Sequence, residues 1–311
     1  MKRITITPDN EEHWLKLRDE DITSTMMSAL FDVSPYNTRF DIYHNKKNGV
    51  ELPFKMNERI EIGSRMEEFA GHEVLIKHGW EGHLFKDYIR IPELKMGSSF
   101  DFEVICPERG KGILEIKAVD YFQYKEKWEE DEAPPHIEIQ LQHQLMVAGP
   151  EYKWGVIAVW TGIYDHHLII RERDEEMMKV LEAETKKFWK QVEDGEEPDI
   201  DLYRDCDLVV KLCDGDQDID LSDNENLLMK YHRLNREVKE AQKELKETKT
   251  QIANVMRLEN AKHGFSKDYE VKVITVKDTP ATLITADMVG NEIGGRDGYN
   301  RIAVKYIGDK K

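Results

Sequence analysis

The chain has few cysteines and no long apolar segment, and both absences restrict its class. Its 311 residues include three cysteines, Cys106, Cys206 and Cys213, which form no Cys-x-x-Cys pair. A disulfide framework or a cysteine-based zinc site is therefore not expected. No apolar run approaches the roughly 20 residues that a membrane span requires. The first residues also lack the apolar core of a signal peptide, so we expect a cytoplasmic protein with no membrane partner.

Glycine-rich nucleotide-binding signatures are also missing. The glycine-rich stretch at residues 290–298 matches neither a phosphate loop nor a dinucleotide fingerprint. The acidic segment 214–225 resembles a calcium-binding EF-hand loop in its carboxylates and its final Glu225, but Ile219 stands where the turn requires glycine. We interpret this segment as an exposed linker, with calcium binding as the alternative.

The net charge of −17 argues against a nucleic-acid partner only until it is located along the chain. Residues 172–225 contain 20 acidic and 7 basic residues, and so carry −13 of the −17. The rest of the chain is therefore nearly balanced. The overall acidity does not exclude binding to nucleic acid.

Two segments in the middle of the chain combine strand patterns with carboxylates. Residues 95–105 and 112–119 are rich in apolar and β-branched residues, and turn formers separate them. Because side chains alternate along a strand, Glu115 and Lys117 share one face, which Asp101 of the neighbouring strand can reach. Two carboxylates and an ammonium suit a divalent cation such as Mg²⁺. A solvated hairpin with a salt bridge is the alternative.

Three further segments carry groups that suit such a site. The hydroxyl residues 23–25 precede an apolar helical segment, where they either cap the helix or, with Arg18, bind a phosphate. Glu67 lies in a helical pattern over residues 57–79, where a solvated face is the usual position of Glu. Residues 137–147 form an amide-rich helix that leads into an almost wholly apolar strand, so we expect some of its glutamines to face a site.

The C-terminal part has a different pattern. From Leu227 to Val255 the apolar positions alternate at spacings of four and three with Lys and Glu between them, which predicts a heptad seam. Such a helix either forms a coiled coil with another chain or packs on its own domain. Residues 269–276 and 301–307 are predicted to form a small β-hairpin. We divide the chain into a domain at residues 1–200, an acidic linker at 201–225 and an appendage at 226–311.

Taken in order, these segments resemble the PD-(D/E)xK nuclease core, and specifically the YqaJ-like viral recombinase family that includes phage lambda exonuclease. The similarity covers roughly residues 14–199. Each motif alone is common, and it is their order that is specific. The matching segments are Arg18 with 22–25, 33–36, 63–67, 99–101, 115–117, 140–145 and 171–176 followed by Phe188 and Trp189. The resemblance implies an α/β fold with a central mixed sheet flanked by helices.

The resemblance also implies a function. The expected activity is that of a metal-dependent 5′-to-3′ exonuclease, which digests one strand of linear double-stranded DNA and leaves 3′ single-stranded overhangs for phage-type recombination. The implied partners are DNA ends, a single-strand annealing protein and further copies of the chain in a ring, such as a trimer. An endonuclease of the same superfamily and a catalytically silent DNA-end-binding or scaffold protein are the alternatives.

The same resemblance assigns roles to individual residues. It implies Mg²⁺, with Mn²⁺ as a substitute, as the cofactor. Lys117 would orient or deprotonate the attacking water, and Arg18 would bind the terminal 5′ phosphate with a hydroxyl from either Ser24 or Thr25. Gln142, with Gln140 second, would position the water or the backbone of the site. The implied metal ligands are Asp101, Glu115, Glu67 and the backbone of Ile116.

Overall fold

The computed structural model describes residues 1–50, 58–128, 132–162, 166–276, 282–283, 292–293 and 299–306. The chain divides into two compact units, Met1–Gly215 and Asp216–Lys311. Over the described ranges, no helix has both the length and the apolar character needed to cross a membrane.

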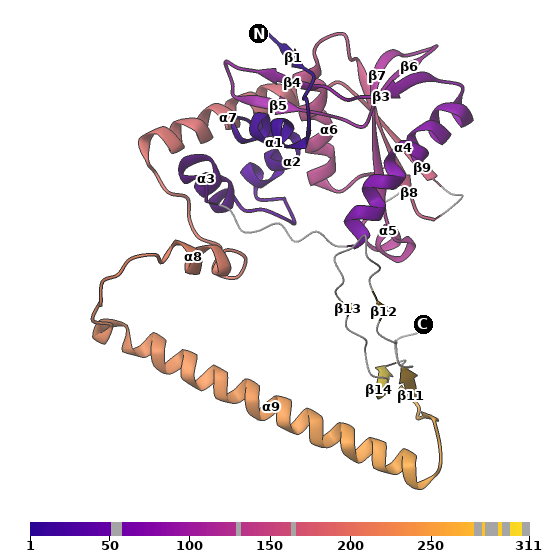
Figure 1. Cartoon of the computed structure of the whole chain (residues 1–311), viewed down its shortest axis with the longest axis vertical. Coiled ribbons are helices and arrows are strands. Elements are labelled where there is room, and N and C mark those ends of the chain that lie inside the picture. The colour runs from indigo at the N-terminus through magenta and orange to yellow at the C-terminus, as the bar shows by residue number, and fades with distance from the viewer. Residues whose placement is uncertain are drawn as a thin grey trace. The chain divides into compact units, whose positions relative to one another are not determined.

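A five-stranded mixed sheet lies at the centre of the first unit (Figure 1). The central strand β7 pairs antiparallel with β6 and parallel with β8, and β8 pairs antiparallel with β9. Every residue of β8 is buried, as its continuous apolar sequence predicts. In spatial order the strands are β3 (Glu81–Leu84), β6 (Phe102–Cys106), β7 (Gly110–Ala118), β8 (Trp154–Trp160) and β9 (His166–Glu172).

A second sheet of four strands changes one prediction. In spatial order it contains β1 (Ile4–Ile6), β4 (Tyr88–Ile91), β5 (Met96–Ser98) and β2 (Ile22–Thr23). The single strand predicted over residues 95–105 is therefore wrong, because β5 and β6 belong to different sheets. Pairing of β5 with β2 and β4 draws it away from β6, and such long-range pairing is not encoded in the local pattern. Asp101 lies in the break between the two strands.

Helices cover both faces of the five-stranded sheet and create two apolar cores. The helix α4 (Glu58–His78) packs on the face that includes Phe102, Leu114 and Val156. The helices α6 (Pro135–Ala148) and α7 (Glu175–Asp194) pack on the opposite face. The central mixed sheet flanked by helices is thereby confirmed. The remaining helices of this unit are α1 (Glu11–Asp19), α2 (Ser24–Met27), the 3-10 helix η1 (Ser28–Phe31), α3 (Arg39–Asn48), α5 (Tyr121–Lys127) and α8 (Cys206–Leu212).

The segment around α8 packs on the first unit. Asp205 is fully buried and accepts a hydrogen bond of 2.6 Å from the Thr38 hydroxyl. Arg204 donates to the carbonyl oxygens of Ser34 and Asn37. The structure thus places residues 201–212 with the first unit, whereas the sequence pattern placed them in the linker. The acidic residues 214–225 that follow are exposed.

The second unit contains a long helix followed by strands. The helix α9 (Glu225–Leu258) spans 34 residues and confirms the long helix predicted from the heptads. The strands β11 (Tyr269–Val276) and β14 (Tyr299–Tyr306) pair antiparallel, which confirms the predicted hairpin strands. The other elements are the 3-10 helix η2 (Ser222–Asn224), β10 (His263–Phe265), β12 (Thr282–Leu283) and β13 (Glu292–Ile293).

Candidate active site

The strand β7 presents Glu115 and Lys117 on one face, as alternation along the strand predicts. Glu115 is only 4% exposed, and the Lys117 ammonium lies 2.7 Å from its Oε1. Burial alone would lower the pKa of Lys117, but Glu115 and Asp101 outweigh burial and raise it. Lys117 therefore carries a positive charge beside these carboxylates. It forms a partly buried ion pair with Glu115, in place of the solvated salt bridge considered as the alternative.

Asp101 faces the same cluster from the break between β5 and β6. Its Oδ2 accepts a hydrogen bond of 2.6 Å from the backbone N–H of Ile116. Burial and then the charge of Glu115 raise the pKa of Asp101 well above its ordinary value, although Lys117 acts in the opposite direction. The backbone of Ile116 therefore orients Asp101 through its N–H group.

Glu67 lies on the helix α4 and interacts electrostatically with Glu115 and Lys117. Burial, followed by the charge of Glu115, raises the pKa of Glu67 to about 6, while Lys117 acts to lower it. The structure thus gathers Asp101, Glu115, Glu67 and Lys117 around one place, although the chain separates them by up to 50 residues. Three carboxylates against one ammonium leave an excess of negative charge.

Two glutamines of α6 hold Glu115 in place, and one of them differs from the prediction. Gln140 donates to Glu115 Oε1 at 2.6 Å, and Gln144 donates to Oε2 at 2.7 Å. Gln142 is predicted to position the water or the backbone of the site, and the structure does not bring its side chain to Glu115. Its amide nitrogen donates to the Glu172 carbonyl, and its oxygen accepts from the Asp174 N–H. It ties α6 to the junction of β9 and α7.

The position of Gln144 follows from helix geometry. Residues four apart lie on the same face of a helix, whereas residues two apart point in different directions. Gln140 and Gln144 therefore share a face that excludes Gln142. Gln144 also donates to the Ser99 carbonyl at 3.3 Å and so connects Glu115 with the segment before Asp101.

The predicted phosphate-binding residues lie around the start of α2. The half-buried guanidinium of Arg18 lies over the Trp14 ring at 4.3 Å from its centroid and donates weakly to the Thr25 hydroxyl at 3.4 Å. Ser24 is buried and accepts from the Ser98 hydroxyl instead. Of the two hydroxyls left open by the sequence, the structure places that of Thr25 beside Arg18.

Trp14 is a residue that sequence reasoning missed in this role. Its indole N–H donates to the Ser99 hydroxyl at 3.2 Å, while its ring supports Arg18. Because Ser99 also contacts Gln144 through its carbonyl, a connected set of side chains joins the Arg18 region to Glu115. The sequence did contain one indication of this contact, because Trp14 and Arg18 are four residues apart on α1 and so lie on the same face of the helix.

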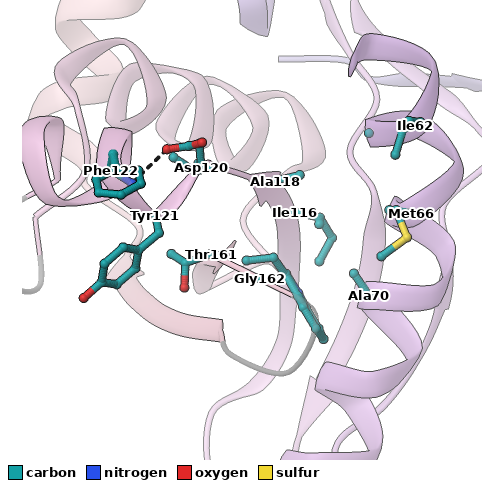
Figure 2. Close-up of a pocket in the computed structure, with 13 residues that line it drawn as sticks. Ile62, Met66, Ala70, Ile116, Ala118, Asp120, Tyr121, Phe122, Thr161 and Gly162 are labelled. Atoms are coloured by element: carbon teal, nitrogen blue, oxygen red, sulfur yellow. Dashed lines mark hydrogen bonds between the residues drawn. The ribbon is translucent and has the colours of Figure 1, made fainter. Parts of the chain in front are cut away.

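A pocket of about 790 Å³ lies on the other face of β7 (Figure 2). Figure 2 shows Met66 and Ala70 of α4 on one side, and Tyr121 and Phe122 of α5 on the other. Its carboxylate, Asp120, accepts from the Phe122 and Gln123 N–H groups and caps α5. Ile116, which stands between Glu115 and Lys117 on β7, lines the pocket, whereas Asp101, Glu115 and Lys117 do not.

The donor set of the cluster fits a hard divalent cation in chemical type. Asp101, Glu115 and Glu67 supply carboxylate oxygens. Burial, and then the charge of Glu115, raises the pKa values of Asp101 and Glu67, so their ionised forms are disfavoured and a cation would stabilise them. In the part of the chain that the structure describes, however, no three His, Cys, Asp or Glu side chains converge in metal-binding geometry. Hydrogen bonds from Lys117, Gln140 and Gln144 engage both oxygens of Glu115.

Comparison with known proteins gives three findings. Residues 13–151 match the profile of the YqaJ-like viral recombinase domain. The uncharacterized protein YqaJ of Bacillus subtilis (strain 168) is 27% identical over 279 residues, which cover 86% of each chain. All residues of the cluster and of the Arg18 region lie within the matched domain.

A solved structure is similar to this chain in fold. LHK-Exo in complex with dAMP matches with a TM-score of 0.50 and 19% identity, over 65% of this chain and 100% of that one. The structure of an alkaline exonuclease (LHK-Exo) from Laribacter hongkongensis gives 0.49 and 17% over the same shares. At this identity the first match supports the fold alone.

Proposed function

We propose that this chain, which carries a domain of the YqaJ-like viral recombinase family at residues 13–151, is a divalent-metal-dependent exonuclease. Its substrate would be linear double-stranded DNA, digested from 5′ to 3′ to leave 3′ single-stranded overhangs for homologous recombination. The observation that carries the proposal is the partly buried contact of Lys117 with Glu115 beside Asp101 and Glu67.

Mg²⁺, with Mn²⁺ as a substitute, is the proposed cofactor. Asp101, Glu115 and Glu67, with the backbone carbonyl of Ile116, would hold it. When bound, such an ion offsets the charge of the phosphodiester and lowers the pKa of water. An uncompensated cluster of three carboxylates would repel a phosphodiester, which is why the site needs a cation.

The side chains of this domain supply the rest of the proposed mechanism. Lys117 would orient the attacking water through the ammonium that faces the carboxylates, or take the proton of that water once it has lost its own. Gln140 and Gln144 would hold Glu115 through both of its oxygens. Because two donors fix that carboxylate, it loses little freedom when it binds a ligand.

Arg18 and Thr25 would bind the 5′-terminal phosphate. A guanidinium and a hydroxyl together form strong, charge-assisted hydrogen bonds to phosphate oxygens. Trp14 would act as a positioning residue, because its ring restricts the guanidinium of Arg18. This arrangement supports recognition of a DNA end that carries a phosphate.

The proposed partners follow from the recombination role. A single-strand annealing protein would take up the overhangs, and further copies of the chain would form a ring, such as a trimer, around the duplex. The acidity concentrated in residues 172–225 is compatible with this arrangement. Contacts with DNA would then depend on local basic groups such as Arg18 and Lys117 rather than on the net charge.

Linear duplex DNA with one 5′-phosphate end and one 5′-hydroxyl end tests the activity. With Mg²⁺ we expect loss of the strand that begins at the phosphorylated end, and no loss with EDTA. A closed circular duplex should remain intact. Cleavage of the circle would instead favour an endonuclease. Binding to ends without degradation in Mg²⁺ or Mn²⁺ would favour a catalytically silent end-binding or scaffold protein.

Replacing Arg18 by alanine should remove the preference for the 5′ phosphate. We expect the ratio of rates on phosphate and hydroxyl ends to fall by about tenfold, because charge-assisted hydrogen bonds to the phosphate are lost. Lys16→Ala on the same helix is the matched control, since Lys16 is exposed and forms its ion pair with Glu12 on the same helix. An unchanged ratio in Arg18→Ala would contradict the assignment.

Replacing Gln144 should affect the cleavage rate, whereas replacing Gln142 should affect the stability of the fold. Gln144→Ala is expected to lower the cleavage rate by about tenfold, because Glu115 loses a fixed donor. Gln142→Ala should leave the rate of the folded protein near that of the wild type and lower stability by about 1–2 kcal/mol, since it breaks two bonds to backbone. Initial rates and thermal unfolding distinguish the two effects, and equal losses of rate would contradict the placement.

A further inference from the structure

The helix α9 exposes a continuous stripe of apolar side chains. Six members of the heptad seam are each at least 43% exposed: Leu227, Tyr231, Leu234, Val238, Leu245 and Val255. A stripe that follows a 3.5-residue repeat from Leu227 to Val255 of this 34-residue helix is the pattern by which helices pair, and a monomer rarely leaves such a stripe exposed to water. The stripe therefore has the form of an interface.

The described part of the second unit does not cover this stripe. Met256 is the buried residue of α9, and it packs near Gly264 of β10. In the heptad register, Met256 occupies an e position at the edge of the seam rather than within it. The strands that follow α9 therefore contact its end, and the seam positions from Leu227 to Leu245 stay open.

The residues of the seam favour pairing of two identical helices. The a positions include the β-branched Val238 and Ile252, while Leu227 and Leu234 occupy d positions. In parallel coiled coils, β-branched residues at a with leucine at d favour two strands. The full seam consists of Tyr231, Val238, Leu245 and Ile252 at a, with Leu227, Leu234, Ala241, Thr248 and Val255 at d.

Charges beside the seam determine the direction of the partner. In a parallel, in-register pair each g residue faces the e residue five positions later on the other helix. Glu244 then faces Lys249, and Glu237 faces Gln242, so no like charges meet. In the antiparallel pair that overlaps the whole seam, Glu237 would face Glu244 on both sides, which is unfavourable.

We propose that α9 binds the α9 helix of a second copy of this chain as a parallel, two-stranded coiled coil. The exposed stripe of one copy thus packs against the same stripe of the other copy. Glu244 of each helix contacts Lys249 of the other, so this contact occurs twice. The pairing does not rest on the nuclease activity, because no residue of the carboxylate cluster takes part. It would join two catalytic units through a contact separate from those of the proposed ring.

Cysteine cross-linking in the full-length chain tests the pairing. Cys206 and Cys213 are exposed and are first replaced by serine, while the buried Cys106 stays. Leu245→Cys then places a thiol at an a position, where equivalent residues face each other in a parallel pair. Under mild oxidation we expect most of this variant to become a covalent dimer. Lys243→Cys, at an f position on the opposite face, is the control and should stay largely uncross-linked.

A charge exchange tests the direction independently. Glu244→Lys and Lys249→Glu should each weaken self-association by about tenfold, since attractive pairs become repulsive. The double exchange should restore association, as measured by sedimentation of the full-length chain. The proposal would be overturned if the single variants associated like the wild type or if the double variant did not recover association. Equal cross-linking at positions 243 and 245 would also overturn it. A monomeric wild type would do so as well, and the stripe would then be free for a different protein.

Discussion

Replacing Lys117 by alanine is expected to lower the rate of strand hydrolysis by about 10³-fold while binding to DNA ends persists. The Lys117 ammonium is the cation 2.7 Å from Glu115, and Asp101 and Glu67 also act on its charge. Its removal leaves the carboxylates without the group that we propose orients the attacking water. The measurement is the initial rate of release of nucleotides from end-labelled duplex DNA, with end binding followed separately at equilibrium.

A matched control lies on the same strand. Lys111 of β7 also forms an ion pair, with Glu103 at 3.0 Å, but it lies away from the carboxylate cluster. Lys111→Ala should retain a rate within about twofold of the wild type, because such a partly exposed pair contributes little. A Lys117→Ala enzyme with more than about a tenth of the wild-type rate would contradict the proposed role.

The contrast between β7 and α6 shows which parts of the site the sequence could reveal. A strand has a period of two, so Glu115 and Lys117 share a face whatever surrounds them. The helix α6 is different, because its residues from Ile139 to Ala148 are all buried. A helix buried on every side has no polar face that reveals its orientation. The spacing groups Gln140 with Gln144, but only the packing shows that this pair, rather than Gln142, meets Glu115.

The sequence also could not predict which strands pair when they lie far apart in the chain. The local pattern of residues 95–105 is that of a strand, yet the pairing of β5 with β2 and β4 separates it from β6. That separation leaves Asp101 in a break, where the N–H of Ile116 fixes it. Similarly, hydroxyls at residues 23–25 indicated a phosphate site, but the contact of Ser24 with Ser98 is what leaves Thr25 beside Arg18.

Asp101→Asn should stabilise the metal-free protein, and the gain should increase with pH. The folded-state pKa values of Asp101 and Glu67 are raised, mainly by burial and then by Glu115. Below the unfolded pKa of about 4 these carboxyl groups are protonated in both the folded and the unfolded state. Their titration therefore does not lower the free energy of unfolding of the wild type there. As the pH rises from the unfolded pKa toward the folded-state pKa values, these carboxyl groups ionise more easily in the unfolded chain than in the folded protein. The free energy of unfolding of the wild type therefore falls. For Glu67 this window extends to about 6.

The asparagine variant lacks this cost at position 101 but keeps an oxygen that can accept from the Ile116 N–H. We expect its melting temperature to exceed that of the wild type by about 2–4 °C at about pH 8, which corresponds to about 1 kcal/mol, and to approach it near pH 4. Thermal unfolding in EDTA across this range is the measurement.

Glu103→Gln provides a control with the opposite sign. Glu103 of β6 accepts from the Tyr152 hydroxyl at 2.6 Å and pairs with Lys111, so its charge is already compensated. Its replacement should lower the melting temperature at about pH 8 instead of raising it.

Added Mg²⁺ should make the wild type more stable than Asp101→Asn, because an ion that binds the folded state stabilises the wild type more than a variant with one carboxylate fewer. An Asp101→Asn protein less stable than the wild type in EDTA at about pH 8 would show that the carboxylate is held by favourable contacts. The excess negative charge would then not be the property that draws a cation to this site.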